Sequence, residues 1–179
     1  MWKVTTIFFM VLSLLLAAAI IVPHRPSTRA FSNMELFRTP MVAQASDGLL
    51  KMTKAKVLVF WSADLQINSR TVLYMHDDHG TVNELIGYTD QIYSGNQAMN
   101  VFMTQLMIGK LNCGQVNTAS KVGQYVAAIG APSICRRGII KDGILVGYIS
   151  LSYPAVPSDA EVERADKVLD SFVPSVFKS

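Results

Sequence analysis

The densest group of side chains suited to metal binding or acid–base chemistry is the run His76-Asp77-Asp78-His79. Imidazole and carboxylate groups bind zinc and manganese, and they also transfer protons in hydrolases. Successive side chains of an extended segment point to opposite faces, however, and a tetrahedral site usually gathers its ligands from two elements. We therefore predict a solvated turn after a strand and no metal site. The candidate ligand pairs are His76 with Asp78, or Asp77 with His79.

The chain has two cysteines, Cys113 and Cys135, and neither lies in a CxxC motif or beside the histidine spacing of a zinc site. Two arginines follow Cys135 directly and could lower the pKa of its thiol, but no histidine stands nearby to act as a base. We expect a packing or disulfide role rather than a nucleophile. A disulfide between the two cysteines and two separate buried thiols both remain open.

Met99, Met103 and Met107 recur every four residues along an expected helix. Methionine reshapes easily around what it binds, so this stripe could line a ligand or partner groove, although helical core is the commoner meaning. The sequence contains no Gly-rich phosphate loop, G-x-S-x-G, HExxH or kinase signature. We expect no enzymatic activity and no cofactor.

Hydrophobic periodicity predicts the elements that must position these residues. Between Lys56 and Leu65 nearly every residue is apolar, which is typical of an interior strand with two buried faces. Asp142-Gly143 favours a tight hairpin turn, because both central residues of such a turn need positive φ. The segment 76–96 is expected to be loop, with a short strand or helical turn around 84–93. The other elements expected are strands 70–75, 134–140 and 144–153, and helices that begin at Asn96, at Thr118 or Ser120, and at Ser158.

The amino-terminal segment is a membrane-span candidate, because Val4 to Val22 contains no charged residue, proline or glycine. As a helix this run would span about 28 Å, close to the hydrocarbon thickness of a bilayer. We therefore expect residues 1–23 to be a transmembrane anchor. Ser13 and Ala17 lie four residues apart and offer a small-residue face on which copies of the helix could pack into a homo-oligomer.

Residues 24–54 are expected to form an amphipathic helical connector next to the membrane, with Met41, Ala45, Leu49 and Met52 along one side. Basic residues outnumber acidic ones six to two between 24 and 56, a stretch that could lie on anionic headgroups. The positive-inside rule weighs Lys3 and the amino terminus against Arg25, Arg29 and Arg38, and by count it favours a cytoplasmic domain. A three-residue basic start before a long apolar run is instead typical of a bacterial export signal or anchor. We expect a single-pass protein of the bacterial inner membrane with a periplasmic domain. The domain is not basic enough to suggest nucleic-acid binding.

Residues 55–179 are expected to form one α+β domain, an antiparallel sheet with packed helices. The chain resembles the GAF/PAS-like class of small sensor domains in its element order and in its closing piece. That piece is Gly138-Ile-Ile-Lys-Asp-Gly-Ile-Leu-Val-Gly-Tyr-Ile-Ser-Leu151, followed by a Pro-Ser-Asp-Ala-Glu helix start. Fold resemblance alone does not give function.

A second resemblance rests on the single anchor, Cys135 before the penultimate strand, and the strand Gly-Tyr-Ile-Ser-Leu-Ser-Tyr that leads to an acidic-capped helix. With these features the chain is similar to the holins of T-even phages over about Val57 to Phe177. This resemblance implies that membrane helices assemble into lesions for host lysis while the exported domain receives an antiholin-like protein. The alternative is a membrane-tethered GAF-like sensor or binding module for a small ligand or protein partner. A third hypothesis is a hydrolase that uses the cluster 76–79.

Overall fold

The computed structural model describes residues 35–93 and 97–178, and for Ala98, Met99 and Phe102 only their place in a helix is described. The expected anchor 1–23, with Ser13 and Ala17, lies outside the described residues. Within the described ranges, no helix is both long enough and apolar enough to cross a bilayer.

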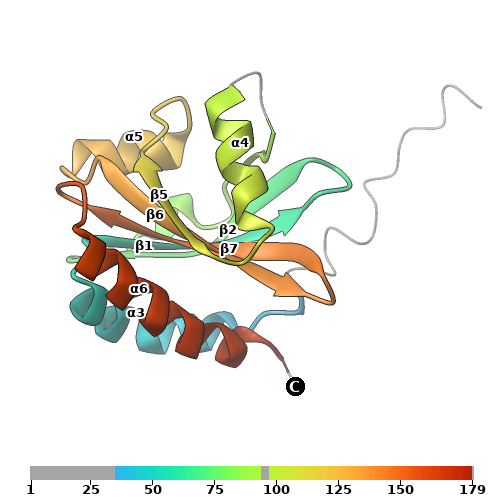
Figure 1. The fold of residues 1–179 in the computed structure, drawn as a ribbon, viewed down its shortest axis with the longest axis horizontal. Helices are drawn as coiled ribbons and strands as arrows, with labels where there is room; N and C mark the ends of the chain where they lie inside the picture. The colour runs from blue at the N-terminus through green and yellow to red at the C-terminus, as the bar shows by residue number, and fades with distance from the viewer. Residues whose placement is uncertain (1–34, 94–96, 179) are drawn as a thin grey trace, which may run out of the picture. The chain divides into compact units, whose positions relative to one another are not determined.

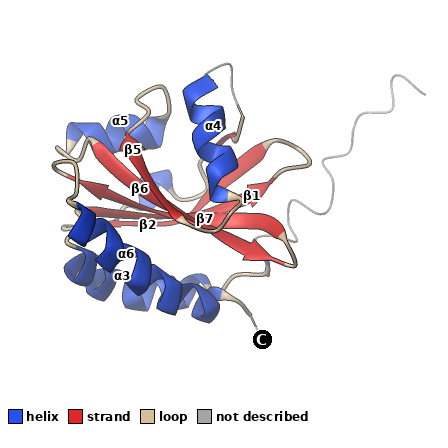
Figure 2. Cartoon of the chain, viewed as in Figure 1, coloured by secondary structure: helices blue, strands red, loops and turns tan. Residues whose placement is uncertain are grey.

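The described residues form one antiparallel seven-stranded sheet with helices on both faces (Figures 1 and 2). The strand order is β3-β2-β1-β7-β6-β5, and the short strand β4 pairs with β2 outside this path. The strands are β1 Val57–Asp64, β2 Ser69–Asp77, β3 Gly80–Thr81, β4 Thr89–Gln91, β5 Leu111–Gln115, β6 Ser133–Lys141 and β7 Ile144–Tyr153. The helices are α3 Thr39–Thr53, α4 Gln97–Leu106, α5 Lys121–Ala128 and α6 Asp159–Phe172, with short 3-10 turns at Asn83–Leu85 and Val173–Val176.

The predicted interior strand is confirmed, because β1 is buried along its whole length and lies between β2 and β7. Leu58 and Phe60 pack into the core on the side of α3 and α6. Val59 and Trp61 pack into a second core on the side of α4 and α5. Figure 1 shows these two helix pairs on opposite faces, so the sheet separates two apolar layers.

Two hairpins are present, β1 with β2 and, as predicted from Asp142-Gly143, β6 with β7. The second turns through Asp142 at φ 51° and Gly143 at φ 76°, the positive values that an Asp-Gly turn tolerates. The helix expected after Ser158 is also present. The backbone N–H of Ser158, the residue that caps the helix, donates to the carboxylate of Glu161 at 3.0 Å.

The helix expected in the connector belongs to the folded domain. The described residues belong to one compact unit, in which α3 packs against β2 and α6. Its buried face carries Val42, Leu49 and Leu50, whereas Met41 and Met52, which were expected on the apolar side, are exposed. The domain boundary therefore lies before α3 rather than at residue 55, because one face of the sheet needs this helix as a cover.

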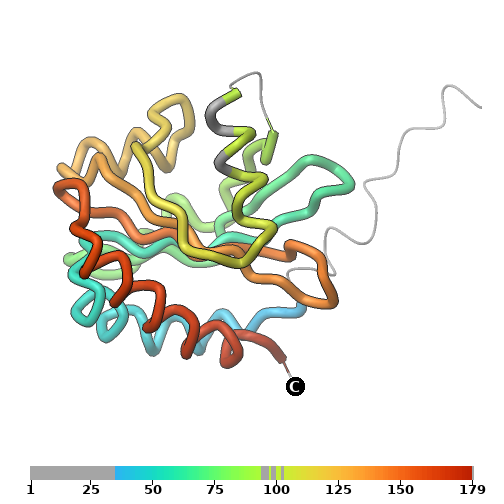
Figure 3. The backbone as a smooth tube through the Cα atoms, in the orientation of Figure 1, coloured from blue at the N-terminus to red at the C-terminus, as the bar shows by residue number. Residues whose placement is uncertain are grey.

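The first and last described segments meet. The backbone N–H of Arg38 donates to the carbonyl of Val176 at 2.7 Å, and that of Lys178 donates to the carbonyl of Leu36 at 2.9 Å. Phe37 and Phe177 stack beside this bridge, with ring centroids 5.8 Å apart. Figure 3 shows the start of α3 next to the end of the α6 segment.

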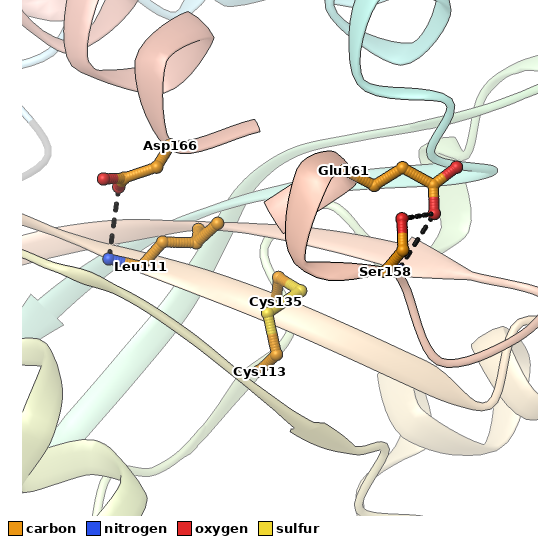
Figure 4. Close-up of a disulfide and its surroundings, with 6 residues drawn as sticks. All are labelled: Leu111, Cys113, Cys135, Ser158, Glu161 and Asp166. Carbon is orange, nitrogen blue, oxygen red and sulfur yellow. Dashed lines mark hydrogen bonds between the residues drawn. A yellow bond between two sulfur atoms is a disulfide. The ribbon is translucent and has the colours of Figure 1, made fainter. Parts of the chain in front are cut away.

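Strand β5 was not predicted, and it carries Cys113 opposite Cys135 of β6. The two sulfurs form a disulfide on the sheet face that α6 covers (Figure 4). Nearby, the backbone N–H of Leu111 donates to Asp166 of α6 at 3.3 Å. Of the two alternatives left open for the cysteines, the structure has the pair joined.

We predict that serine at both cysteine positions lowers the free energy of unfolding by about 3 kcal/mol, because the bridge closes a loop with a sequence separation of 22 residues. Urea unfolding of the full-length chain in detergent would measure this. The wild type with added reductant should move to the midpoint of the variant. Equal midpoints for the oxidised wild type and the variant would contradict a stabilising disulfide.

Candidate functional site

A small cavity lies between the sheet and the amino-terminal half of α5. Its volume is about 20 Å³, room for one or two water molecules. Apolar residues of β1 and α5, among them Val59, Trp61 and Val126, form part of the wall. The polar residues of the lining are Arg70, Asn117, Ser120, Arg136, Tyr148 and Ser150.

Strand register brings most of these side chains together. Tyr148 of β7 lies opposite Trp61 of β1, and Ser150, two residues on, lies opposite Arg136 of β6. Side chains two residues apart in a strand share a face. The sheet therefore presents aromatic, hydroxyl and guanidinium groups to α5 from neighbouring strands.

Arg70 is buried, with 5% of its surface exposed, and three groups surround its guanidinium. It donates to the hydroxyl of Tyr148 at 3.0 Å and to the carboxylate of Asp90 at 2.8 Å. It also lies over the ring of Trp61, 4.9 Å from the centroid. Burial alone would lower the pKa of Arg70, but Tyr148 and Asp90 hold that pKa above its usual value.

Arg136 is the second buried guanidinium, with 6% of its surface exposed. Burial lowers its pKa to about 10; Tyr148 acts in the opposite direction, and the positive charge of Arg70 lowers the pKa further. At neutral pH the side chain is still protonated. The cavity wall therefore carries two positive charges, whereas Asp90 is not part of the described lining.

Within the residues of the lining, two buried polar atoms have no hydrogen-bond partner among the described residues. One is the hydroxyl oxygen of Ser150, in a residue that is 1% exposed, and the other is Nε of Arg70. Buried polar atoms are usually paired, because leaving one unpaired costs about 1–3 kcal/mol. Unpaired polar atoms that line a cavity are therefore candidates to contact a ligand or water.

The α5 end of the cavity is a helix amino terminus. The hydroxyl of Ser120 accepts a hydrogen bond from the backbone N–H of Gly123 at 3.0 Å, which caps the helix. A side chain at Gly123 would place its Cβ 1.8 Å from the carbonyl oxygen of Asn117. Glycine thus allows this tight turn onto the helix, and the turn brings Asn117 and Ser120 to the cavity.

Within the run 76–79, for which no metal site was predicted, His76 and Asp77 point to opposite faces of the sheet. Nε2 of His76 lies 2.7 Å from the carboxylate of Asp47 in α3, and its Nδ1 lies 3.2 Å from the hydroxyl of Tyr74. Asp77 instead accepts a hydrogen bond from Tyr125 of α5 at 2.7 Å. Asp77, Asp78 and His79 have potential ligand atoms within 4.8 Å of one another, and His76 is not part of this group.

The methionine stripe is not a continuous groove wall in the part of the chain that is described. Met103 is fully buried in the core between α4 and the sheet, and it does not line the cavity. Met107 lies beyond the end of α4 and is 43% exposed. For Met99, only its place in α4 is described.

Sequence reasoning missed the cavity residues Arg70, Tyr148 and Ser150, and considered Arg136 only as a neighbour of Cys135. One signal was available. Arg70 begins an otherwise apolar predicted strand, and a charge at a position that points into a core indicates either a buried partner or a site.

Solved structures with a similar fold are GAF domains of sensor proteins. The GAF domain of a two-component sensor histidine kinase from Bacillus halodurans matches with a TM-score of 0.55 and 14% identity, over 76% of this chain and 91% of that chain. The phycoerythrobilin-bound GAF domain of a cyanobacterial phytochrome matches with a TM-score of 0.56 and 14% identity, over 83% and 88%. The described domain has a GAF-like fold.

Another similar structure is the chromophore-binding domain of an unusual bacteriophytochrome from R. palustris, with a TM-score of 0.52 and 12% identity. The match covers 84% of this chain, which spans only 61% of that longer one. No protein-family model matches the sequence, and no curated protein matches it either. The predicted α+β, GAF-like domain is thus confirmed at the level of fold.

We predict that Asp90→Asn lowers the free energy of unfolding by about 2 kcal/mol, because it leaves the buried guanidinium of Arg70 without its carboxylate. Chemical denaturation at pH 7 would measure this. The matched control is Asp78→Asn in an exposed turn, which should change stability by no more than about 0.5 kcal/mol. Equal effects of the two variants would contradict the role given to Asp90.

A second prediction concerns the hydrogen bond between Tyr125 and Asp77. Burial alone would raise the pKa of Asp77, but hydrogen bonds from Tyr125 and from the backbone of His79 hold that pKa below its usual value. Burial and Asp77 in turn raise the pKa of Tyr125 to about 12. A carboxyl with a lowered folded-state pKa stabilises the fold above its unfolded-state pKa, and this contribution is lost as pH falls through the folded-state value.

Tyr125→Phe should therefore lower the free energy of unfolding at pH 7 by about 1.5 kcal/mol, and the difference from the wild type should shrink below about pH 4. Denaturation curves from pH 3 to pH 8 would test this. Tyr93→Phe is the control, since the Tyr93 hydroxyl is exposed and, among the described residues, makes a long contact with the sulfur of Met107, at 3.8 Å. A deficit for Tyr125→Phe that stays constant with pH would argue against an ionised Asp77 as the acceptor.

Proposed function

We propose that this protein is a membrane-tethered sensor or binding module whose GAF-like domain takes a small ligand in the cavity under α5. The observation that carries the proposal is the cavity itself, where buried polar atoms of Arg70 and Ser150 lack partners among the described residues. Ligand sites combine an apolar wall with a few convergent polar groups, and the wall described here has both.

Similarity in fold to GAF domains of a sensor kinase and of phytochromes supports a sensory role in outline. Some of those domains are named as bilin-bound, but the present cavity is far smaller than the roughly 300–1,000 Å³ typical of sites for drug-sized ligands. We therefore propose a ligand of a few heavy atoms, or the compact end of a larger one, rather than a tetrapyrrole.

We propose binding rather than catalysis. The described lining of the cavity offers guanidinium, hydroxyl and amide groups, but it includes no imidazole, thiol or carboxylate. A hydrolytic site needs a general base within hydrogen-bond reach of its nucleophile. The residue types of the lining favour holding a molecule over transforming it.

We also propose that the domain is exported. The disulfide between Cys113 and Cys135 supports this, because such bonds persist in oxidising compartments such as the bacterial periplasm. The apolar run from Val4 to Val22 would supply the tether to the inner membrane. Holin-type lesion formation, assembly through Ser13 and Ala17, and an antiholin-like partner stay predictions from the sequence.

The proposal is tested by thermal unfolding of the full-length chain in detergent against a library of small neutral and charged compounds. At least one compound should raise the melting temperature saturably. Ser150→Val, which removes the unpaired hydroxyl and adds a methyl group at the cavity wall, should reduce that shift by more than half.

Ser152→Val is the matched control. Ser152 lies two residues along the same strand, is fully buried and also has an unpaired hydroxyl among the described residues, but it does not line the cavity. Its variant should respond to the compound as the wild type does. A library without a saturable shift, or shifts that both variants retain, would overturn the cavity as the binding site.

A further inference from the structure

We infer that the cavity recognises a compact oxyanion, with a small carboxylate favoured over phosphate, held by Arg136 and Arg70 against the start of α5. This inference deepens the proposed binding function and rests on it. It assigns the ligand a charge and a size.

The first argument is the balance of charge around the cavity. Arg70 and Arg136 both line it and both are buried, but Asp90, which pairs with Arg70, is not part of the described lining. The guanidinium of Arg70 is close enough for its positive charge to lower the pKa of Arg136, which means that the two charges repel. A bound anion would offset that repulsion, whereas a cation would add to it.

The second argument is that the unpaired groups can all donate hydrogen bonds. Nε of Arg70 is a donor only, and the hydroxyl of Ser150 can donate one hydrogen bond. The amino terminus of α5 adds the positive end of the helix dipole, although the N–H of Gly123 is already bonded to the hydroxyl of Ser120. A ligand that accepts several hydrogen bonds at one point satisfies this set, and an ionised oxyanion does so most strongly.

The third argument is size. A cavity of about 20 Å³ has room for one or two water molecules, which is close to the space that the two oxygens of a carboxylate need. A tetrahedral phosphate, with four oxygens, is larger than this space. The volume therefore ranks a carboxylate first.

The experiment uses the full-length chain in detergent, with sodium formate, sodium acetate and sodium phosphate as probes and sodium chloride at equal ionic strength as the reference. Formate or acetate should raise the melting temperature saturably beyond chloride, with phosphate weaker. Arg136→Gln should weaken the apparent affinity by about tenfold or more, since a charge-assisted hydrogen bond is lost.

The chain offers a matched control in the next residue. Arg137 points to the other face of the sheet, where it pairs with Asp166 and Asp170 of α6. Arg137→Gln removes the same charge one residue away and should leave the carboxylate affinity within about twofold of wild type, a change too small to reflect a lost contact. Should Arg136→Gln fail to fold, Ser150→Ala with Ser152→Ala as its control tests the same site, and the Ser150 variant alone should bind several-fold more weakly.

The outcomes separate this inference from the proposed function. The oxyanion inference would be overturned if the carboxylates raised the melting temperatures of wild type and Arg136→Gln equally, or if no saturable rise beyond that in chloride were seen. If phosphate alone binds and Arg136→Gln abolishes its binding, the cavity binds an oxyanion as inferred, but the preference for a carboxylate is wrong. A neutral compound whose binding depends on Ser150 but not on Arg136 would refute the oxyanion and leave the cavity as a binding site.

Discussion

The pairing of β1 with β7 at the centre of the sheet is the constraint on which the rest of the domain depends. Both strands are buried on both faces, so each face needs a helical cover. The face that contains Leu58 and Phe60 is covered by α3 and α6, and for this reason a helix that looks like a connector in the sequence is part of the core. The opposite face is covered by α4 and α5, and the cavity lies under α5.

The two faces differ in chemistry. The α3 and α6 side is closed by apolar packing, the disulfide and the ion pairs of Arg137 with α6. The α5 side contains two buried guanidiniums, each of which carries a desolvation penalty of several kcal/mol. Trp61, Tyr148 and Asp90 offset this penalty at Arg70. A domain of this size that keeps such groups inside departs from the rule that cores are apolar, and departures of this kind tend to mark functional sites.

Sequence reasoning predicted the elements with strong local signals. The apolar run of β1, the Asp142-Gly143 turn and the Ser158–Glu161 cap each depend on neighbouring residues alone. Strand β5, Leu-Asn-Cys-Gly-Gln, has a weak intrinsic preference for strand and exists because β6 pairs with it. The cavity was out of reach for a similar reason, since Arg70, Arg136 and Ser150 come from three strands and meet only through sheet register. Periodicity likewise grouped Met103 and Met107, although α4 ends between them.

The bridge between Phe37 and Phe177 has a mechanical consequence. Two backbone hydrogen bonds tie the first described segment to the last, so the two ends of the described domain lie side by side. A force on the chain ahead of Glu35 would act first on these two hydrogen bonds and on the stacked rings of Phe37 and Phe177, on the α3 and α6 side.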